Sequence, residues 1–378
     1  MKRNFLAAAV AGAITLLIGV PTQAQNKEIV IGVATAMTGA GAATGRQVAS
    51  GVQQAAKEIN EAGGIKGAKV KVIVEDDRSA PGGTVNAFNK LLAEQPTLIV
   101  GPTWTTFMTT LAPIIRRAGV PVMTSAIGAS PTNPEVSGGW IFRTAPTDIT
   151  LASSLVDYTL KEIKPKQPAI MTPNDEYGRG ALKLFKQAFE KAGIKFVAEE
   201  TFNQGDKDVS AQVLKIKSTK PDVLILWPAL PADAALLINQ VRQLGIEAKL
   251  IGSPGMAVDE FGNLAKQGAD GITTITAWVP NITPEAKAWA GRMKQTDPEA
   301  MITFTSVENY DGAMIAFKAL ASANGLDPAS VRKALAATKD HKGIVGSYSF
   351  DDRGDGLHTA NVVRWEGGQM RPISTRRD

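Results

Sequence analysis

The chain has 378 residues, a length that predicts two or three domains, and its composition of 44% hydrophobic and 20% charged residues is that of an ordinary globular protein. Cysteine is absent, which excludes disulfides, a cysteine nucleophile, thiolate metal sites and iron–sulfur clusters. With only two histidines, His341 and His358, a histidine-rich metal centre is excluded too. The formal net charge is +5, but the cations are scattered among nearly as many acids, so no nucleic-acid partner is expected.

Residues 1–24 have the pattern of a cleavable secretory signal. Lys2 and Arg3 form a basic start, Phe5 to Val20 is apolar, and Thr22-Gln23-Ala24 is a small-x-small cleavage site. The alternative is a membrane anchor, but the apolar run is shorter than the ~20 residues that a spanning helix needs. We therefore expect an exported protein in a bacterial periplasm, away from ATP and NAD. The chain has no cysteine for lipid attachment, and we expect no stable membrane insertion.

Short apolar runs then alternate with segments of helical spacing. Ile29–Val33 is typical of a buried strand. In Gly45–Ala62, apolar side chains recur on one helical face, and Gly63-Gly64 ends that pattern. The alternation continues with strands at Val70–Val74, Leu98–Val100 and Val120–Met123 and helices at Val85–Leu92 and Phe107–Arg117.

A second alternating series follows Arg143. Because β–α alternation builds a parallel sheet with helices on both faces, two series predict an α/β protein with two doubly wound lobes. The later segments are too few for a third lobe and are expected to complete the first two. The second series has helices at Ile149–Leu160, Ala181–Ala192, Val209–Ile216 and Ala234–Leu244, and strands at Ala169–Met171, Phe196–Glu200, Val223–Leu226 and Leu250–Ile251. The later segments are helices near Glu285–Lys294, Ser306–Ala321 and Ser330–Ala337 and strands at Ser347–Phe350 and Asn361–Trp365.

In open α/β sheets, ligands bind beyond the carboxyl ends of the strands. Six loops follow predicted strands in this way and are the candidate ligand-binding loops. They are Ala34–Thr44, Gly101–Thr106, Thr124–Ala129, Thr172–Gly178, Trp227–Pro231 and Gly252–Met256.

The first of these loops is rich in glycine. Gly39–Thr44 comes within one residue of the dinucleotide fingerprint G-x-G-x-x-G, and the acids Glu75, Asp76 and Asp77 follow the next strand, where a ribose-binding acid would lie. The third glycine is replaced by Thr44, the loop is long and the chain is exported, so we expect flexible backbone beside a cleft.

Two other loops carry side chains suited to a ligand. Thr103–Thr106 opens a helix, where threonine is a common cap and where free N–H groups and hydroxyls also bind a carboxylate. Trp104 is a large apolar group in a polar loop, which favours a ligand. In the second lobe, Tyr177 can offer both a ring face and a hydroxyl, while Asp175 is explained by helix capping.

Known catalytic patterns are missing. The sequence has no G-x-S-x-G elbow, no H-E-x-x-H and no Walker A run. Asp351–Gly356 resembles the start of a calcium loop, but Val362 stands where the terminal glutamate belongs, so a turn is expected. We therefore expect no metal, no cofactor and no enzymatic activity.

Several of these segments together resemble the Leu/Ile/Val-type periplasmic binding proteins of ABC transporters. The resemblance covers nearly the whole mature chain in order, and it is carried by IVIGVATAMTG at 29–39, AGGIKG at 62–67, VEDD at 74–77, IVGP at 99–102, FRT at 142–144, NDEYGRG at 174–180 and FDDRGD at 350–355. It implies a type I binding fold of two α/β lobes with three crossings, near Thr147, Thr276 and Arg353. Lobe 1 would then be 25–147 plus 277–353, and lobe 2 would be 148–276 plus 354–378.

The resemblance also implies a ligand site. In the family, the ligand carboxylate is held by two loops. They match Thr103–Thr105 and the three residues Ala126, Ile127 and Gly128 of this chain. The ammonium is held by an acid in the second lobe and a hydroxyl in the first, and these positions fall here at Pro254 and Gly128. This sequence therefore keeps the loops that bind the carboxylate of the ligand but lacks the side chains that bind its ammonium. Asp259 or Glu260 could still supply the acid.

This departure predicts the class of ligand. A buried ammonium without a partner costs several kcal/mol, and losing a charge-assisted hydrogen bond costs ~1.5–3 kcal/mol. Either would defeat micromolar binding of an amino acid, which is worth about 8 kcal/mol. We expect a carboxylate without an α-amino group, aromatic or branched, with Trp104, Tyr177 and Trp227 around its apolar body. Family members are known to bind aromatic acids.

The resemblance further implies what the protein does with this ligand. A monomer would deliver the captured molecule to the permease subunits of an ABC importer. The same fold also serves as a ligand-sensing receptor component, which is the alternative function.

Overall fold

The computed structural model describes residues 28–377 except 129, 280–282 and 358. The predicted signal at 1–24 therefore lies outside the described residues, as do Ala129 and His358. Within the described residues, no helix is both long and apolar enough to cross a membrane.

The first lobe is built on a six-stranded parallel sheet. Its strand order is β13-β5-β4-β3-β1-β2, so the chain winds outward in both directions from β1 and β3. The strands are β1 (Ile29–Thr35), β2 (Val70–Asp76), β3 (Leu98–Val100), β4 (Val122–Thr124), β5 (Ile141–Pro146) and β13 (Asp355–Leu357).

Helices cover both faces of this sheet. One face packs against α1, α10 and α11, and the other against α2 and α3. The helices are α1 (Ala42–Glu61), α2 (Pro81–Ala93), α3 (Thr105–Ala118), α4 (Pro134–Ser137), α10 (Pro284–Thr296), α11 (Phe304–Ser322) and α12 (Pro328–Ala336). A two-stranded ribbon, β11 (His341–Lys342) with β12 (Ser347–Tyr348), follows α12.

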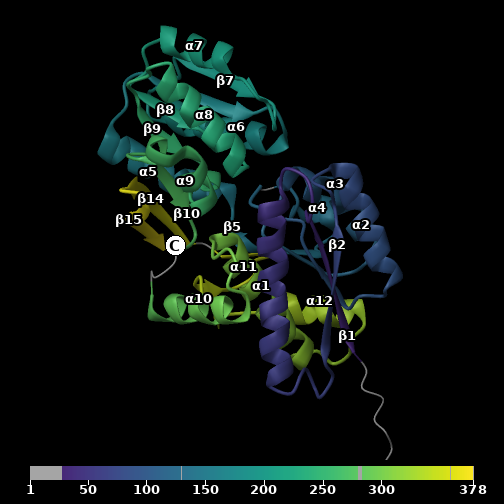
Figure 1. The fold of residues 1–378 in the computed structure, drawn as a ribbon. Coiled ribbons are helices and arrows are strands. Elements are labelled where there is room, and N and C mark those ends of the chain that lie inside the picture. The colour runs from purple at the N-terminus through teal and green to yellow at the C-terminus, as the bar shows by residue number, and fades with distance from the viewer. Residues whose placement is uncertain (1–27, 129, 280–282, 358, 378) are drawn as a thin grey trace, which may run out of the picture.

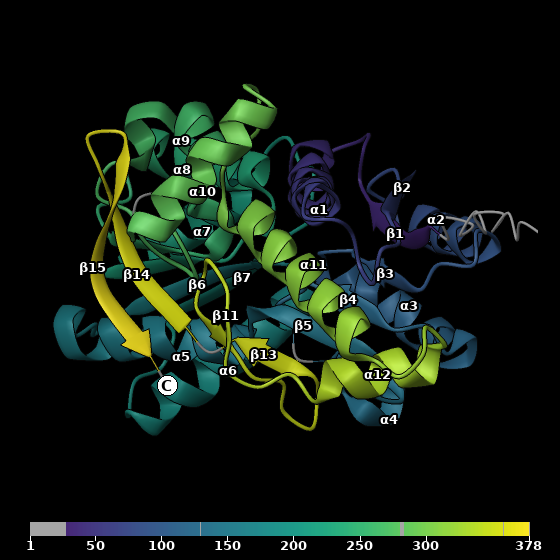
Figure 2. The same ribbon diagram turned by 90° about the horizontal axis from the view of Figure 1, so that it is seen from below.

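The second lobe repeats the winding of the first. Its sheet has the order β15-β14-β10-β9-β8-β6-β7, in which the five strands from β10 to β7 are parallel and β14 and β15 are antiparallel additions (Figure 2). The strands are β6 (Pro168–Pro173), β7 (Ala198–Phe202), β8 (Val223–Leu226), β9 (Lys249–Gly252), β10 (Thr273–Thr276), β14 (Thr359–Glu366) and β15 (Gln369–Arg377). Its helices are α5 (Asp148–Tyr158), α6 (Glu176–Lys191), α7 (Ser210–Ser218), α8 (Pro231–Gln243) and α9 (Asp259–Ala265).

The chain passes between the lobes three times, and the two lobes lie side by side as separate bodies (Figure 1). The first passage joins β5 to α5, the second follows β10, and the third joins β13 to β14. The expected third crossing near Arg353 is therefore wrong. Asp355 pairs with Arg143 of β5, so residues 354–357 belong with lobe 1 and not with lobe 2.

Most predicted elements are confirmed within a few residues, and the two-lobed α/β class is confirmed. The buried face of α1 includes Val48, Val52 and Ala55, as its spacing predicts. Helix α3 ends at Gly119, whose left-handed φ of 62° lets its N–H bond the carbonyl of Ile115. The prediction missed strands β5, β10, β11, β13 and β15 and the short helices α4 and α9.

Candidate functional site

A cavity of about 330 Å³ lies between the two lobes, at the carboxyl ends of both parallel sheets. This is the point in each sheet where the strand order reverses, so loops after β1 and β3 face loops after β6 and β8. All six candidate loops contribute to its wall. Its lining residues are Thr44, Gln47, Ser79, Pro81, Thr103, Trp104, Thr105, Thr106, Phe107, Ser125, Ile127, Pro146, Leu151, Pro173, Asn174, Asp175, Tyr177, Asn203, Gln204, Ala229, Pro231, Pro254, Gly255, Val258, Ala277, Phe304, Thr305 and Glu308.

The start of helix α3 forms part of this wall. Trp104 stands at the N-cap position with extended backbone, and no side chain caps the helix. The first intrahelical bond runs from Met108 N–H to the Trp104 carbonyl, so the N–H groups of Thr105, Thr106 and Phe107 have no partner within the helix. Together with the positive end of the helix dipole, they make a site for an anion.

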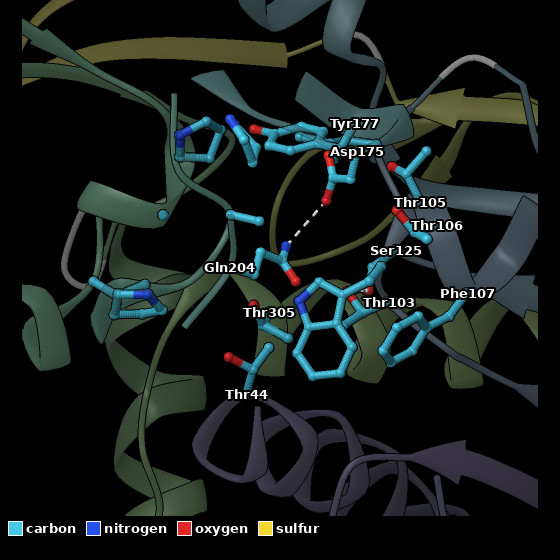
Figure 3. A pocket seen from close by; sticks show the side chains of 18 of the residues that line it. Thr44, Thr103, Thr105, Thr106, Phe107, Ser125, Asp175, Tyr177, Gln204 and Thr305 are labelled. Carbon is cyan, nitrogen blue, oxygen red and sulfur yellow. Dashed lines mark hydrogen bonds between the residues drawn. The ribbon is translucent and has the colours of Figure 1, made fainter. Parts of the chain in front are cut away.

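The hydroxyl groups of Thr103 and Ser125 line the same cavity (Figure 3). The Nδ2 of buried Asn309 donates to the Thr305 carbonyl and to Ser125 Oγ, the latter at 3.0 Å. Ser125 Oγ lies 2.7 Å from Thr103 Oγ1. Since Ser125 accepts from Asn309, it can direct its own proton to Thr103, which leaves the Thr103 hydroxyl free to donate to a ligand.

Only part of the loop at 126–128 lines the cavity, and the rest of it packs within the first lobe. Of the predicted residues Ala126, Ile127 and Gly128, only Ile127 lines the cavity. The N–H of Ala126 donates to Thr124 Oγ1, and the N–H of Gly128 donates to Thr105 Oγ1, both at 3.0 Å. The expectation that Ala126 and Gly128 face the ligand is therefore wrong, because their amides are already bonded within the lobe.

A buried arginine fixes this loop. The guanidinium of Arg143, on β5, donates to the carbonyls of Ile127 at 2.8 Å and Gly128 at 2.6 Å. Its Nε lies 3.2 Å from Asp355 Oδ1 on β13. Both strands lead directly into crossings between the lobes, and Asp148 N–H at the start of α5 also donates to Ile127. The loop beside the ligand cavity is thus tied to two of the hinge strands.

Aromatic side chains form the apolar part of the wall from both lobes. Trp104 packs edge-on against Phe107, with ring centroids 5.2 Å apart. Across the cavity, Tyr177 stacks on Trp227 at 6.4 Å, and Trp227 meets Phe185 edge-on at 4.9 Å. Trp227 is fully buried and does not line the cavity, so the expectation that it touches the ligand is wrong. It lies behind Tyr177 and supports that ring.

The second lobe offers little to an ammonium at the expected position. Pro254 lines the cavity as predicted, but it has no polar side-chain atom. Asp259 and Glu260, the alternative sources of the acid, begin α9 and do not line the cavity. Asp175 does line the cavity, but its carboxylate caps α6 through Gly178 N–H and accepts from Gln204 Nε2 at 3.2 Å (Figure 3).

One carboxyl in the lining was missed by the sequence analysis. Glu308 belongs to α11, only 2% of it is exposed, and it lines the cavity. Burial, assisted by Asp311 one turn away, raises the pKa of Glu308 well above its ordinary value. The prediction considered loops after strands, and a helix that enters the site from elsewhere in the chain gives no such signal.

The glycine-rich loop after β1 is held by Asp76, the last residue of β2, and by Ser79. Asp76 accepts from the N–H groups of Met37 and Thr38 and from the Thr38 hydroxyl, and Ser79 Oγ accepts from Gly41 N–H. Burial alone would raise the pKa of Asp76, but these bonds and that of Arg78 lower it to about 2. Asp76 therefore positions the glycine-rich loop. This role explains the acid at this position without a bound ribose.

Asp77 provides a stability test of this loop anchor. Burial, opposed by the Ser79 N–H and reinforced by Asp76, raises the pKa of Asp77 to about 6. The unfolded chain loses this proton first, so wild-type stability falls between about pH 4 and pH 6. We expect Asp77→Asn to stabilise the protein by about 1–3 kcal/mol at pH 8 and not below pH 4, in urea unfolding.

Asp76→Asn is the matched control for that experiment. Because the pKa of Asp76 is lowered in the folded state, its removal should destabilise the protein at pH 8. Equal effects of Asp77→Asn at pH 4 and pH 8 would contradict the prediction.

No metal site emerges in the described part of the chain, where no cluster of three or more potential metal-ligating side chains occurs. The segment 351–356 forms a turn, as expected: Asp351 Oδ1 accepts from the N–H groups of Arg353 and Asp355, each at 2.9 Å. The carboxylate is thus used to close the turn.

Two α/β lobes joined by three passages of the chain, with an uncapped helix start and aromatic side chains lining the cavity between them, are typical of a two-lobed solute-binding protein. The Periplasmic binding protein family matches residues 28–369, and the chain belongs to that family, with the type I fold. It is 30% identical to Leu/Ile/Val-binding protein homolog 3 of Brucella melitensis biotype 1, over 92% of this chain and 94% of that protein.

Solved structures agree with this assignment. The branched-chain amino acid transporter substrate binding protein of Streptococcus pneumoniae, solved with isoleucine, is 25% identical, covers 92% of this chain and 99% of its own, and has a TM-score of 0.84. An ABC-transporter solute binding protein of Rhodopseudomonas palustris HaA2, solved with p-hydroxybenzoic acid, shares the fold with a TM-score of 0.83 and 22% identity, covering 93% of this chain and 97% of its own.

Proposed function

We propose that this protein is exported to the periplasm through the signal at 1–24, captures a small carboxylate-bearing molecule between its lobes and delivers it to an ABC importer. One observation carries the proposal: the uncapped start of α3 presents the N–H groups of Thr105, Thr106 and Phe107 to the cavity. None of the described lining residues is Lys or Arg, so these amides and the nearby hydroxyls would bind the anion.

The ligand in this proposal is an aromatic or other carboxylic acid without an α-amino group. Pro254 and Gly128 offer no polar side chain where the family binds the ammonium, and Asp259 and Glu260 do not line the cavity. An ammonium buried at that position would have no partner, which costs several kcal/mol. The rings of Trp104 and Tyr177 suit a flat apolar body.

The fold itself does not choose between ligands. The Streptococcus pneumoniae protein was solved with isoleucine and the Rhodopseudomonas palustris protein with p-hydroxybenzoic acid, on closely similar architectures. The choice rests on the side chains of this cavity, which is in the usual size range of small-molecule sites.

A thermal-shift screen tests the proposal. Because a ligand that binds only the folded state stabilises it by about 2.7 kcal/mol at 100 times its Kd, we expect benzoates or branched carboxylic acids to raise the Tm. Benzamide and benzyl alcohol, which lack the carboxylate, serve as matched controls and should have no effect. Tight leucine binding by calorimetry, with no response to amine-free acids, would contradict the proposed ligand class.

The alternative function is ligand sensing. A free binding protein can present its ligand to a membrane receptor instead of a permease. Uptake of the radiolabelled ligand separates the two: deletion of the gene abolishes uptake if the protein serves transport, and leaves uptake intact while removing the transcriptional response if it serves a sensor. Neighbouring genes for permeases and ATPases would favour transport.

A further inference from the structure

Glu308 is a buried carboxyl group that the proposed carboxylate site does not use. It lines the cavity with only 2% of its surface exposed, and no side chain or backbone group of the described residues hydrogen-bonds to its carboxyl. Asp311, one turn further along α11, shows the contrast. Its carboxyl accepts bonds from the N–H groups of Ile344 and Val345 and from the Tyr348 hydroxyl.

The position of Glu308 places it in the wall beside the anion site. The next residue, Asn309, donates to Ser125 in the hydroxyl chain that leads to Thr103. One turn later, a carbon added at Gly312 would lie 3.1 Å from Thr144 of β5. This part of α11 is therefore packed against the ends of the first-lobe strands, and Glu308 has a fixed backbone position.

Because Glu308 lines an open cavity, water can reach its carboxyl until a ligand fills the space. A ligand that displaces this water leaves the carboxyl unpaired, at a cost, unless it supplies a hydrogen bond of its own. Burial and Asp311 both favour the neutral form of Glu308. A neutral carboxyl has one O–H donor and a carbonyl acceptor, which complement a hydroxyl group. An ammonium would instead need Glu308 to be ionised. The nearby carboxyl of Asp311 and the carboxylate of the ligand both disfavour that ionised form.

We propose that Glu308 is the second polar contact of the bound ligand and selects a carboxylic acid that also carries a hydroxyl group. This inference rests on the proposed function, since the carboxylate of the same ligand occupies the start of α3. Glu308 thereby distinguishes hydroxy acids from their deoxy analogues, which would leave its carboxyl unpaired.

Calorimetry with matched ligand pairs tests the inference on wild type, Glu308→Gln and Glu308→Leu. The probes are 3- and 4-hydroxybenzoate against benzoate, and leucine against 4-methylpentanoate. We expect wild type to bind a hydroxybenzoate at least ~10-fold more tightly than benzoate. Glu308→Gln keeps a donor and an acceptor and should retain the preference. Glu308→Leu should reduce it to less than ~2-fold while benzoate still binds.

Three results would overturn the inference. The preference could survive unchanged in Glu308→Leu, wild type could show none, or leucine could bind ~10-fold more tightly than 4-methylpentanoate and lose that advantage in Glu308→Gln. If wild type binds no carboxylate at all, the proposed function fails and this inference fails with it. If Glu308→Leu does not fold, Glu308→Ala replaces it in the same comparison.

Discussion

We expect Arg143→Met to lower the free energy of unfolding by about 3–5 kcal/mol and to weaken ligand binding. The substitution leaves Asp355 buried without its partner and removes the donors to the carbonyls of Ile127 and Gly128. A loss of this size is a large share of the 5–15 kcal/mol that stabilises a typical domain. Urea unfolding measures it, and calorimetry with the ligand found in the screen measures the binding.

Arg353→Met is the matched control. Arg353 also approaches Asp355, at 3.9 Å, but its side chain is 46% exposed. Removing an exposed partner typically costs less than about 1 kcal/mol. Similar losses from the two substitutions would show that burial of the Arg143–Asp355 pair has no special role at the hinge.

We expect Trp104→Asp to abolish the proposed carboxylate binding without a matching loss of stability. An aspartate at the N-cap accepts hydrogen bonds from the same amides of α3 that would hold the ligand. Two lost charge-assisted bonds at ~1.5–3 kcal/mol each correspond to at least ~100-fold in Kd. Calorimetric titration gives the affinity, and thermal unfolding gives the stability.

Trp104→Ala separates the cap from the loss of the ring. Both variants lose the contact with Phe107, but only the aspartate fills the anion site. Trp104→Asp should be more stable than Trp104→Ala by about 0.5–2 kcal/mol and still bind the ligand far more weakly. Equal affinities in the two variants would show that the start of α3 is not where the carboxylate binds.

The sequence predicts the candidate loops well because parallel strands end at a common edge. A buried strand followed by a helix is visible from spacing, so loops such as Gly101–Thr106 and Thr172–Gly178 could be assigned to that edge before their contacts were known. The same rule applied to the loops after β2 and β7 would have added Ser79 and Gln204 to the predicted cavity residues.

The missed features share a physical cause: polar groups buried by tertiary contacts. Strand β5 contains Arg143 and β10 contains three threonines, so neither has an apolar run, although Thr274 bonds the Ser253 carbonyl inside the lobe. Glu308 likewise looks like an ordinary helical surface residue. Its burial depends on where α11 packs, which spacing along one helix does not show.

In the proposed function, the lobes close on a small carboxylate held between them. The chain has no cysteine, so spin labels at Asn89→Cys on α2 and Glu190→Cys on α6, both exposed, report one distance between the lobes. Pulsed electron-spin resonance should show that distance shorten when a carboxylic acid from the screen is added, and not when benzamide is added. An unchanged distance distribution at saturating ligand would contradict the account.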